Sequence, residues 1–92
     1  MKDEEIAELQ NLGGVSAELL SQIGITTKSD LEKTGPIPAF CTLWEETEKE
    51  PNLNLLYAMV GALKGVHWQE IAQTEKYDLL MELEAYKDEK GI

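Results

Sequence analysis

The sequence contains no arginine, and its eight lysines are outnumbered by eighteen aspartates and glutamates, giving a formal net charge of −10 at pH 7. Binding to nucleic acid by charge alone requires clustered lysines and arginines that neutralise phosphates, and these lysines are scattered along the chain. Docking on an anionic membrane requires a similar excess of positive charge. The composition therefore excludes a protein that holds either polyanion through a broadly basic surface.

Cysteine and histidine are scarce as well, since Cys41 and His67 are the only residues of their types. A lone cysteine forms no internal disulfide, and a Cys/His zinc site needs about four ligands. Cys41 and His67 are in principle a nucleophile and a base, but no local motif or third orienting residue accompanies them. Phosphate-loop and calcium-loop patterns are also missing. We therefore expect no enzyme activity, no metal and no cofactor.

Long hydrophobic runs are missing too. The longest apolar-rich stretch, Leu53 to Leu63, is far shorter than the roughly 20 residues that cross a bilayer. The acidic N-terminus has no apolar segment behind it, so no signal peptide is expected. With 92 residues, no repeat and no linker, the chain is predicted to be one cytoplasmic domain, residues 1–92.

Helical periodicity, punctuated by glycine and proline, dominates what the sequence does contain. Strand-like alternation never lasts, so we predict an all-α fold of five or six short helices. Ser16, Thr27 or Ser29, and Asn52 are predicted N-caps, and Gly24 is predicted to end a helix. The expected helices are about Asp3 to Asn11, Ala17 to Ile23, a short one through Leu31 to Thr34, Ile37 to Thr47, Leu53 to Leu63, and His67 to Lys87.

The segment after Asn52 is apolar almost all round, which predicts a central, buried helix. Gly61 is small enough there to let a neighbouring backbone approach closely. The last helix carries an apolar stripe that includes Ile71, Leu79 and Leu83, and we expect it to pack over the central helix. The aromatic residues are interpreted as core and boundary packing rather than a ligand cage; they are Trp44, Tyr57, Trp68, Tyr77 and Tyr86.

A glycine-rich turn between the first two predicted helices resembles a helix-hairpin-helix unit at the N-terminal end. In one interpretation, backbone N–H groups at the start of the second helix hold a phosphate without reading sequence. In the other, the hairpin only packs, because Glu18 is the only charged residue between Leu9 and Thr27. The candidate phosphate-contacting residues are Gly13, Gly14, Val15 and Ser16 in the hairpin, with Lys28 and Lys33 as the nearest lysines.

Two groups of residues carry a family resemblance. The first comprises Asn11-Leu12-Gly13, Ser16, Leu20, Gly24-Ile25, Thr27, Leu31 and Gly35. The second, more specific group comprises Leu53-Asn54-Leu55-Leu56-Tyr57-Ala58-Met59, Gly61-Ala62-Leu63, Gly65 and His67-Trp68. Together they resemble the C-terminal domain of the TfoX/Sxy family of competence regulators, over about Leu9 to Leu83.

The resemblance implies a helical, helix-hairpin-helix-like domain without enzymatic activity. It also implies a link to natural competence for DNA transformation, in which the parent proteins act as transcriptional co-regulators. Those full-length proteins carry an N-terminal domain before this one, so we expect a stand-alone copy.

We favour a regulatory or interaction module that contacts a protein partner through an apolar groove or exposed face. The transcription machinery is one candidate for that partner. The alternative function is phosphate contact through the Gly13–Ser16 hairpin. No membrane partner is expected, and a homodimer that completes the core across a two-fold axis stays open.

Asn54 is a polar residue in the otherwise apolar central helix. If it is buried, it needs a hydrogen-bond partner, because an unpaired buried group costs about 1–3 kcal/mol. His67 or a carbonyl of the hairpin is a suitable partner. We therefore hypothesise that Asn54 and His67 are structural polar residues that fix the helix geometry, with His67 at the start of the last helix.

Overall fold

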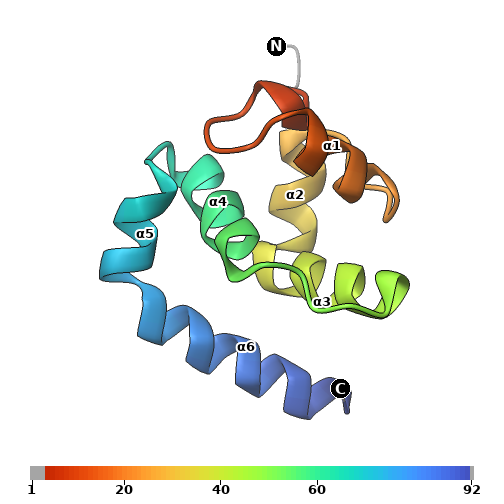
Figure 1. The fold of residues 1–92 in the computed structure, drawn as a ribbon, viewed down its shortest axis with the longest axis vertical. Helices are drawn as coiled ribbons and strands as arrows, with labels where there is room; N and C mark the ends of the chain where they lie inside the picture. Colours follow the sequence, from red (N-terminus) through yellow and green to blue (C-terminus); the bar gives the residue numbers. More distant parts are fainter. Residues whose placement is uncertain (1–3, 92) are drawn as a thin grey trace.

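The computed structural model describes residues 4–91, which form an all-helical fold (Figure 1). Within this range the extended pairing is limited to an isolated antiparallel bridge between Glu5 and Thr27. The predicted fold class is therefore confirmed. The elements are one 3-10 turn, η1 (Ile6–Glu8), and six α-helices, α1 (Gly14–Ser21), α2 (Lys28–Thr34), α3 (Pro36–Thr47), α4 (Leu53–Lys64), α5 (Trp68–Thr74) and α6 (Lys76–Lys90).

Local capping signals set several helix ends as the sequence predicts. The hydroxyl of Thr27 accepts a hydrogen bond from the Asp30 N–H at 3.2 Å, which caps α2. The Asn52 Oδ1 atom accepts from the Asn54 N–H at 2.8 Å and caps α4. Gly24 and Gly65 follow α1 and α4 with φ of 81° and 74°, a conformation that glycine adopts without steric cost.

Helix α4 is the centre of the fold and packs against α2, α3 and α5 (Figure 1). Its apolar residues close it off from solvent on nearly every side after the first turn, as the all-round apolar pattern predicts. Helix α4 is therefore the central element of the fold, against which α2, α3 and α5 pack. Its buried residues are Leu56, Tyr57, Ala58, Met59, Val60, Gly61 and Ala62.

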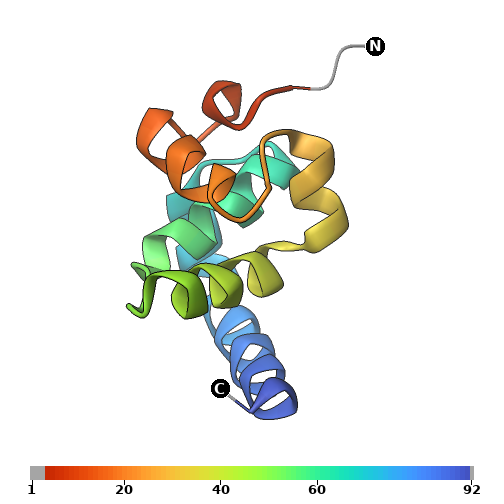
Figure 2. The same ribbon diagram turned by 90° about the vertical axis from the view of Figure 1, so that its right-hand side faces the viewer.

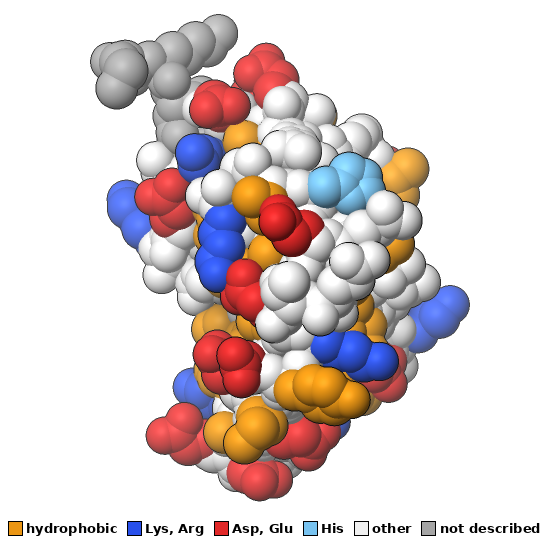
Figure 3. Space-filling view, turned by 90° about the vertical axis from the view of Figure 1, so that its left-hand side faces the viewer, with side chains coloured by type: hydrophobic (Ala, Val, Ile, Leu, Met, Phe, Trp, Pro, Cys, Tyr) orange, Lys and Arg blue, Asp and Glu red, His pale blue; other side chains and the backbone are white. Residues whose placement is uncertain are grey.

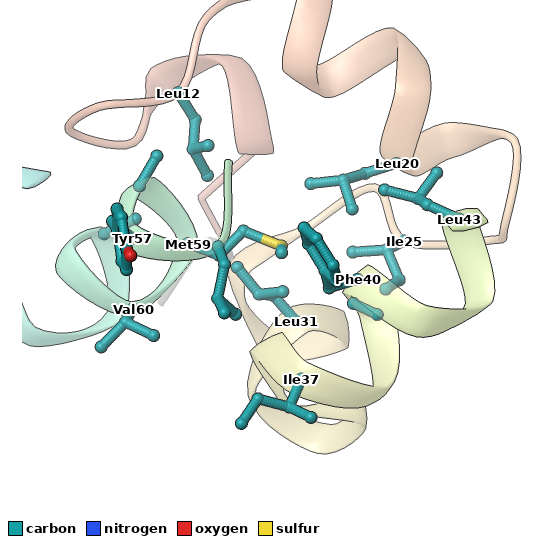
Figure 4. Close-up of a cluster of buried hydrophobic side chains, with 14 of the residues drawn as sticks. Leu12, Leu20, Ile25, Leu31, Ile37, Phe40, Leu43, Tyr57, Met59 and Val60 are labelled. Carbon is teal, nitrogen blue, oxygen red and sulfur yellow. The ribbon is translucent and has the colours of Figure 1, made fainter. Parts of the chain in front are cut away.

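The core centres on the contact between α3 and α4. Phe40 of α3 faces Met59 of α4, with Leu31 of α2 beside them (Figure 4). All three side chains are fully buried. One turn further along α3, Trp44 meets Phe40 edge to face, with ring centroids 6.3 Å apart. Residues from three helices thus converge on one hydrophobic cluster.

The prediction of a helix over Asp3 to Asn11 is wrong. Only a 3-10 turn, Ile6–Glu8, forms there, and Asp3 lies outside the described residues. The Ile6 N–H donates to the carbonyl of Thr26 at 3.2 Å, so this backbone pairs with the connection between α1 and α2 instead of with itself. Asn11 then takes a left-handed φ of 73°. The hairpin unit therefore has a single turn on one side and a full helix on the other.

The predicted helix from His67 to Lys87 is two helices, α5 and α6, which meet at Glu75. Glu75 has φ −121° and ψ 6°, and both of its carboxylate oxygens accept from Lys64 Nζ at 2.7 Å. The break lets α5 pack against α4 while α6 turns to pack against α3. As a result α6 lies along one edge of the molecule (Figure 2).

Candidate functional site

The glycine hairpin forms the N-terminus of α1. Gly13 is the N-cap, and the first intrahelical bond runs from the Ala17 N–H to the Gly13 carbonyl at 2.9 Å. The preceding N–H groups of Gly14, Val15 and Ser16 have no acceptor within the helix. Ser16, predicted as the N-cap, is instead the third residue of α1, and no side chain caps this end. Val15 is 77% exposed, so this helix end opens to solvent.

The two candidate lysines lie on α2. Lys28 is its half-buried first residue, and its backbone N–H donates to the carbonyl of Glu4 at 2.8 Å. Lys33 is exposed, five residues further on, or about 7.5 Å along the helix axis. The acidic segment Glu4-Glu5 therefore runs beside the start of α2, which reduces the local excess of positive charge.

A capping box at the start of α2 carries the clearest electrostatic perturbation among the described carboxylates. Asp30 accepts hydrogen bonds from the backbone of Thr26 at 3.1 Å and of Thr27 at 3.3 Å. The pKa of Asp30 is lowered from its ordinary value, chiefly by the Thr26 backbone hydrogen bond, because these donors favour the ionised carboxylate. This arrangement stabilises the helix end and is not a substrate site.

Asn11 is a structural polar residue that the sequence analysis did not single out for that role. Its amide Nδ2 donates to the carbonyl of Val66 at 2.8 Å, and its Oδ1 accepts from the Trp68 N–H at 3.0 Å. It thereby joins the first loop to the turn between α4 and α5. Gly61 makes room for it, since a Cβ there would lie 2.6 Å from both Asn11 Nδ2 and the Val66 carbonyl.

Asn54 and His67 are both exposed, and they lie at the starts of two different helices, α4 and α5. Asn54 is exposed in the first turn of α4, so the condition of burial on which its structural role depended is not met. His67 is the N-cap of α5, and its Nδ1 accepts from the Gln69 N–H at 3.1 Å. The pair does not form one polar contact. The long-range side-chain bonds in this region are instead made by Asn11, to Val66 and Trp68.

Cys41 and His67 do not form a nucleophile–base pair. Cys41 is 1% exposed within α3, and burial raises the pKa of its thiol, although the nearby Lys87 charge acts in the opposite direction. His67 is exposed at the start of α5 and already accepts a backbone hydrogen bond. A buried, protonated thiol is inert as a nucleophile.

Two further kinds of site are not found within residues 4–91. No group of three or more His, Cys, Asp and Glu side chains there is arranged to hold a metal ion. None of the helices described there combines the length and the apolar character needed to cross a bilayer. The remaining surfaces of interest are those where apolar side chains reach solvent.

Two of the three large hydrophobic side chains that are exposed within residues 4–91 lie on α6. Tyr77 is 80% exposed and Met81 is 72% exposed, and they lie one helical turn apart. Ala85, also exposed, continues the row by another turn. We call Tyr77, Met81 and Ala85 the α6 outward face. The expectation that Tyr77 packs in the core or at its boundary is wrong, because the break at Glu75 points the opposite side of α6 at α3.

A shallow apolar groove runs along another side of α6. It has a volume of about 490 Å³ and lies between α6, the end of α4 and the proline-rich start of α3. Glu75 stands at its edge but is neutralised by Lys64. The groove and the α6 outward face are separate surfaces on one helix. Its lining includes Ile37, Pro38, Val60, Leu63, Leu79 and Glu82.

Two crystal structures of proteins from Listeria monocytogenes are similar to this chain. One, titled an uncharacterized protein in a triclinic form, has a TM-score of 0.76 and 29% sequence identity, covering 90% of this chain and 93% of that chain. The other, titled a protein of unknown function in a tetragonal form, has a TM-score of 0.70 and 30% identity, covering 90% and 96%. No curated protein matches this chain.

The family model described as the TfoX C-terminal domain matches residues 2–83. This span contains both groups of residues on which the resemblance rests, from Asn11-Leu12-Gly13 to His67-Trp68. Its match extends over most of the 92-residue chain. The chain therefore belongs to the TfoX C-terminal domain family.

Proposed function

We propose that this protein is a non-enzymatic regulatory module that acts by binding a protein partner through the α6 outward face. Membership of the TfoX C-terminal domain family supports a regulatory role, and the resemblance to competence regulators links that role to the control of DNA transformation. The buried Cys41 and the backbone-bonded His67 offer no catalytic pair. Partner contact remains as the activity that the surface supports best.

The exposure of Tyr77 and Met81 carries this proposal. Large apolar side chains that reach solvent side by side mark protein-binding surfaces, and tyrosine and methionine are enriched there. Packing of the fold does not require either residue, since α6 buries Leu79 and Leu83 instead. Both residues belong to a 15-residue helix at the edge of the molecule (Figure 2).

Site-specific photo-crosslinking in living cells tests the proposal. A photoreactive residue in place of Ala85 leaves Tyr77 and Met81 intact, and the same residue in place of exposed Glu32 on α2 is the control. We expect a discrete crosslinked protein at position 85 that is absent at position 32. That product should disappear in a Tyr77→Ser/Met81→Ser background. Identical products at both positions would contradict binding through α6.

A second candidate function is phosphate contact at the N-terminus of α1, favoured by the exposed Gly14 and Val15 and by the lack of a side-chain cap. Titration with a mixed-sequence DNA duplex at low and moderate salt tests it. Salt-sensitive binding that a Lys28→Glu/Lys33→Glu variant loses would support phosphate contact. Absence of binding at low salt would remove this candidate.

A further inference from the structure

We propose that the segment bound by the α6 outward face is a basic amphipathic helix, with apolar residues one turn apart and lysines or arginines beside them. This inference rests on the proposed function and names the chemistry of the partner. It depends on how the charges of α6 are distributed around Tyr77 and Met81. Three observations lead to it.

The first observation is where the lysines near the end of α6 lie. Lys87 Nζ sits 4.6 Å from the centroid of the Trp44 ring on α3, and its side chain is only 21% exposed. Lys90 Nζ lies 5.6 Å from the Tyr86 ring centroid. Both distances suit cation–π contacts, which hold these charges against their own molecule. Lys87 Nζ also lies 3.6 Å from Glu84 Oε1, so Lys87 pairs with Glu84 and leaves Asp78 as the acid beside Met81 that these two lysines do not offset.

The second observation is the sign of the charges that flank that face. Between Tyr77 and Tyr86 the helix carries three acids and no lysine. Asp78 and Glu84 lie three residues before and after Met81, which makes them its neighbours on the helix surface. The Glu84 side chain is 69% exposed. In the lower part of the space-filling view, hydrophobic side chains lie beside acidic ones, with lysines also in contact (Figure 3).

The third observation is the shape of the apolar row. Tyr77, Met81 and Ala85 are spaced four residues apart, so they extend over about 12 Å of helix. A partner helix of three turns spans this length with apolar residues at positions i, i+4 and i+8. The exposed Tyr77 ring is also an acceptor for an arginine or lysine in a cation–π contact.

Charge argues against the other occupants of the same face. Two copies related by a two-fold axis at Met81 with antiparallel helices would place Asp78 of one copy beside Glu84 of the other. A net charge of −10 per chain adds repulsion between copies. Nucleic acid and anionic lipid are repelled in the same way. A basic protein segment would instead be attracted by the acidic residues around this face.

Fluorescence anisotropy with a defined probe tests the inference. The probe is a peptide of about 14 residues, with leucines on one helical face and lysines elsewhere. A matched peptide carries glutamate at every lysine position. We expect at least about tenfold tighter binding of the lysine peptide, and weakening of that binding as the salt concentration rises. Equal binding of the two peptides, or no binding of either, would overturn the inference.

Two pairs of variants separate a specific site from general attraction to an acidic protein. Tyr77→Ser/Met81→Ser should weaken lysine-peptide binding at least about fivefold, whereas Val15→Ser, which removes an exposed apolar side chain elsewhere, should not. Asp78→Asn/Glu84→Gln should weaken it, whereas Glu18→Gln/Glu32→Gln, with the same change in net charge, should not. Equal losses in test and control variants would overturn the inference.

Amide chemical shifts of the labelled protein locate the bound peptide. Shifts centred on Tyr77 to Ala85 are expected, and shifts centred on the groove residues Ile37 and Leu63 would assign the peptide to the groove instead and overturn the inference. The crosslinking experiment separates this result from the proposed function. If a partner is crosslinked at position 85 but the lysine peptide does not bind, partner binding through α6 is retained and the basic segment is rejected. If neither a crosslink nor peptide binding is found, both the proposed function and this inference are rejected.

Discussion

Helices α4 and α6 bury very different shares of their residues, although both belong to one small domain. Seven of the twelve residues of α4 are buried, against two of the fifteen residues of α6. Packing therefore determines most positions in α4, including Tyr57, Ala58 and Gly61 of the segment that carries the family resemblance. The outer positions of α6 are free from that demand, which leaves them available for a partner.

Two methionines allow the sharpest test of this comparison. Met59 in α4 is fully buried, whereas Met81 in α6 is 72% exposed. Met59→Ala should lower the free energy of unfolding by about 2–5 kcal/mol through lost burial and a new cavity. Met81→Ala makes the same chemical change and should alter it by no more than about 0.5 kcal/mol. Urea denaturation measures both, and similar losses would contradict the difference in burial between α4 and α6.

The close approach at Gly61 gives a second test of how tightly α4 is packed. Gly61→Ala places a Cβ 2.6 Å from the Val66 carbonyl, a backbone atom that cannot move without shifting the turn. We expect a loss of about 1–3 kcal/mol in unfolding free energy. Gly14→Ala is the control, because a Cβ on that helical glycine meets nothing within 4 Å. Thermal denaturation of the two variants should separate them, and equal melting temperatures would contradict this account.

The Lys87–Trp44 contact tests how firmly α6 is held to α3. Lys87→Met keeps the apolar stem but removes the charge 4.6 Å from the ring centroid. We expect a loss of about 0.5–1 kcal/mol, and none for Lys76→Met at the exposed start of the helix. Urea midpoints followed by tryptophan fluorescence would measure the change. An unchanged midpoint for Lys87→Met would show that the charge does not hold α6 in place.

We expect the smallest change in stability from protonation of Asp30 on α2, a helix outside the comparison of α4 with α6. The folded state lowers the pKa of Asp30 below its ordinary 3.8, so its contribution to stability is present above that value. The contribution is lost as pH falls through the lowered pKa. Asp30→Asn should thus be less stable than the parent at pH 7, and the difference should shrink at low pH. A pH-independent difference in urea midpoints would contradict this linkage.

Local signals in the sequence were sufficient to predict the middle of the fold. Thr27 and Asn52 cap helices because their side chains bond the backbone two or three residues ahead. Gly24 ends α1 through its own backbone conformation. The all-round apolar pattern after Asn52 predicts a buried helix for the same local reason. None of these features depends on a distant part of the chain.

What the sequence did not predict depends on contacts between distant residues. The break at Glu75 involves no glycine or proline and coincides with an ion pair to Lys64, eleven residues earlier. The bonds of Asn11 reach 55 and 57 residues along the chain. The exposure of Tyr77 follows from the direction that α6 takes after the break. Sequence periodicity alone carries no information about these partners.

The burial of Cys41 gives this domain a natural reporter of its own opening. It is the only thiol in the chain, and it is 1% exposed in the α3 segment of the core. A thiol reagent can reach it only when α3 separates from its neighbours, so the rate of labelling counts opening events directly. The opening rate of the wild-type protein can therefore be measured without an introduced cysteine. A bound partner that restrains α6 against α3 would lower the rate at which Cys41 is labelled.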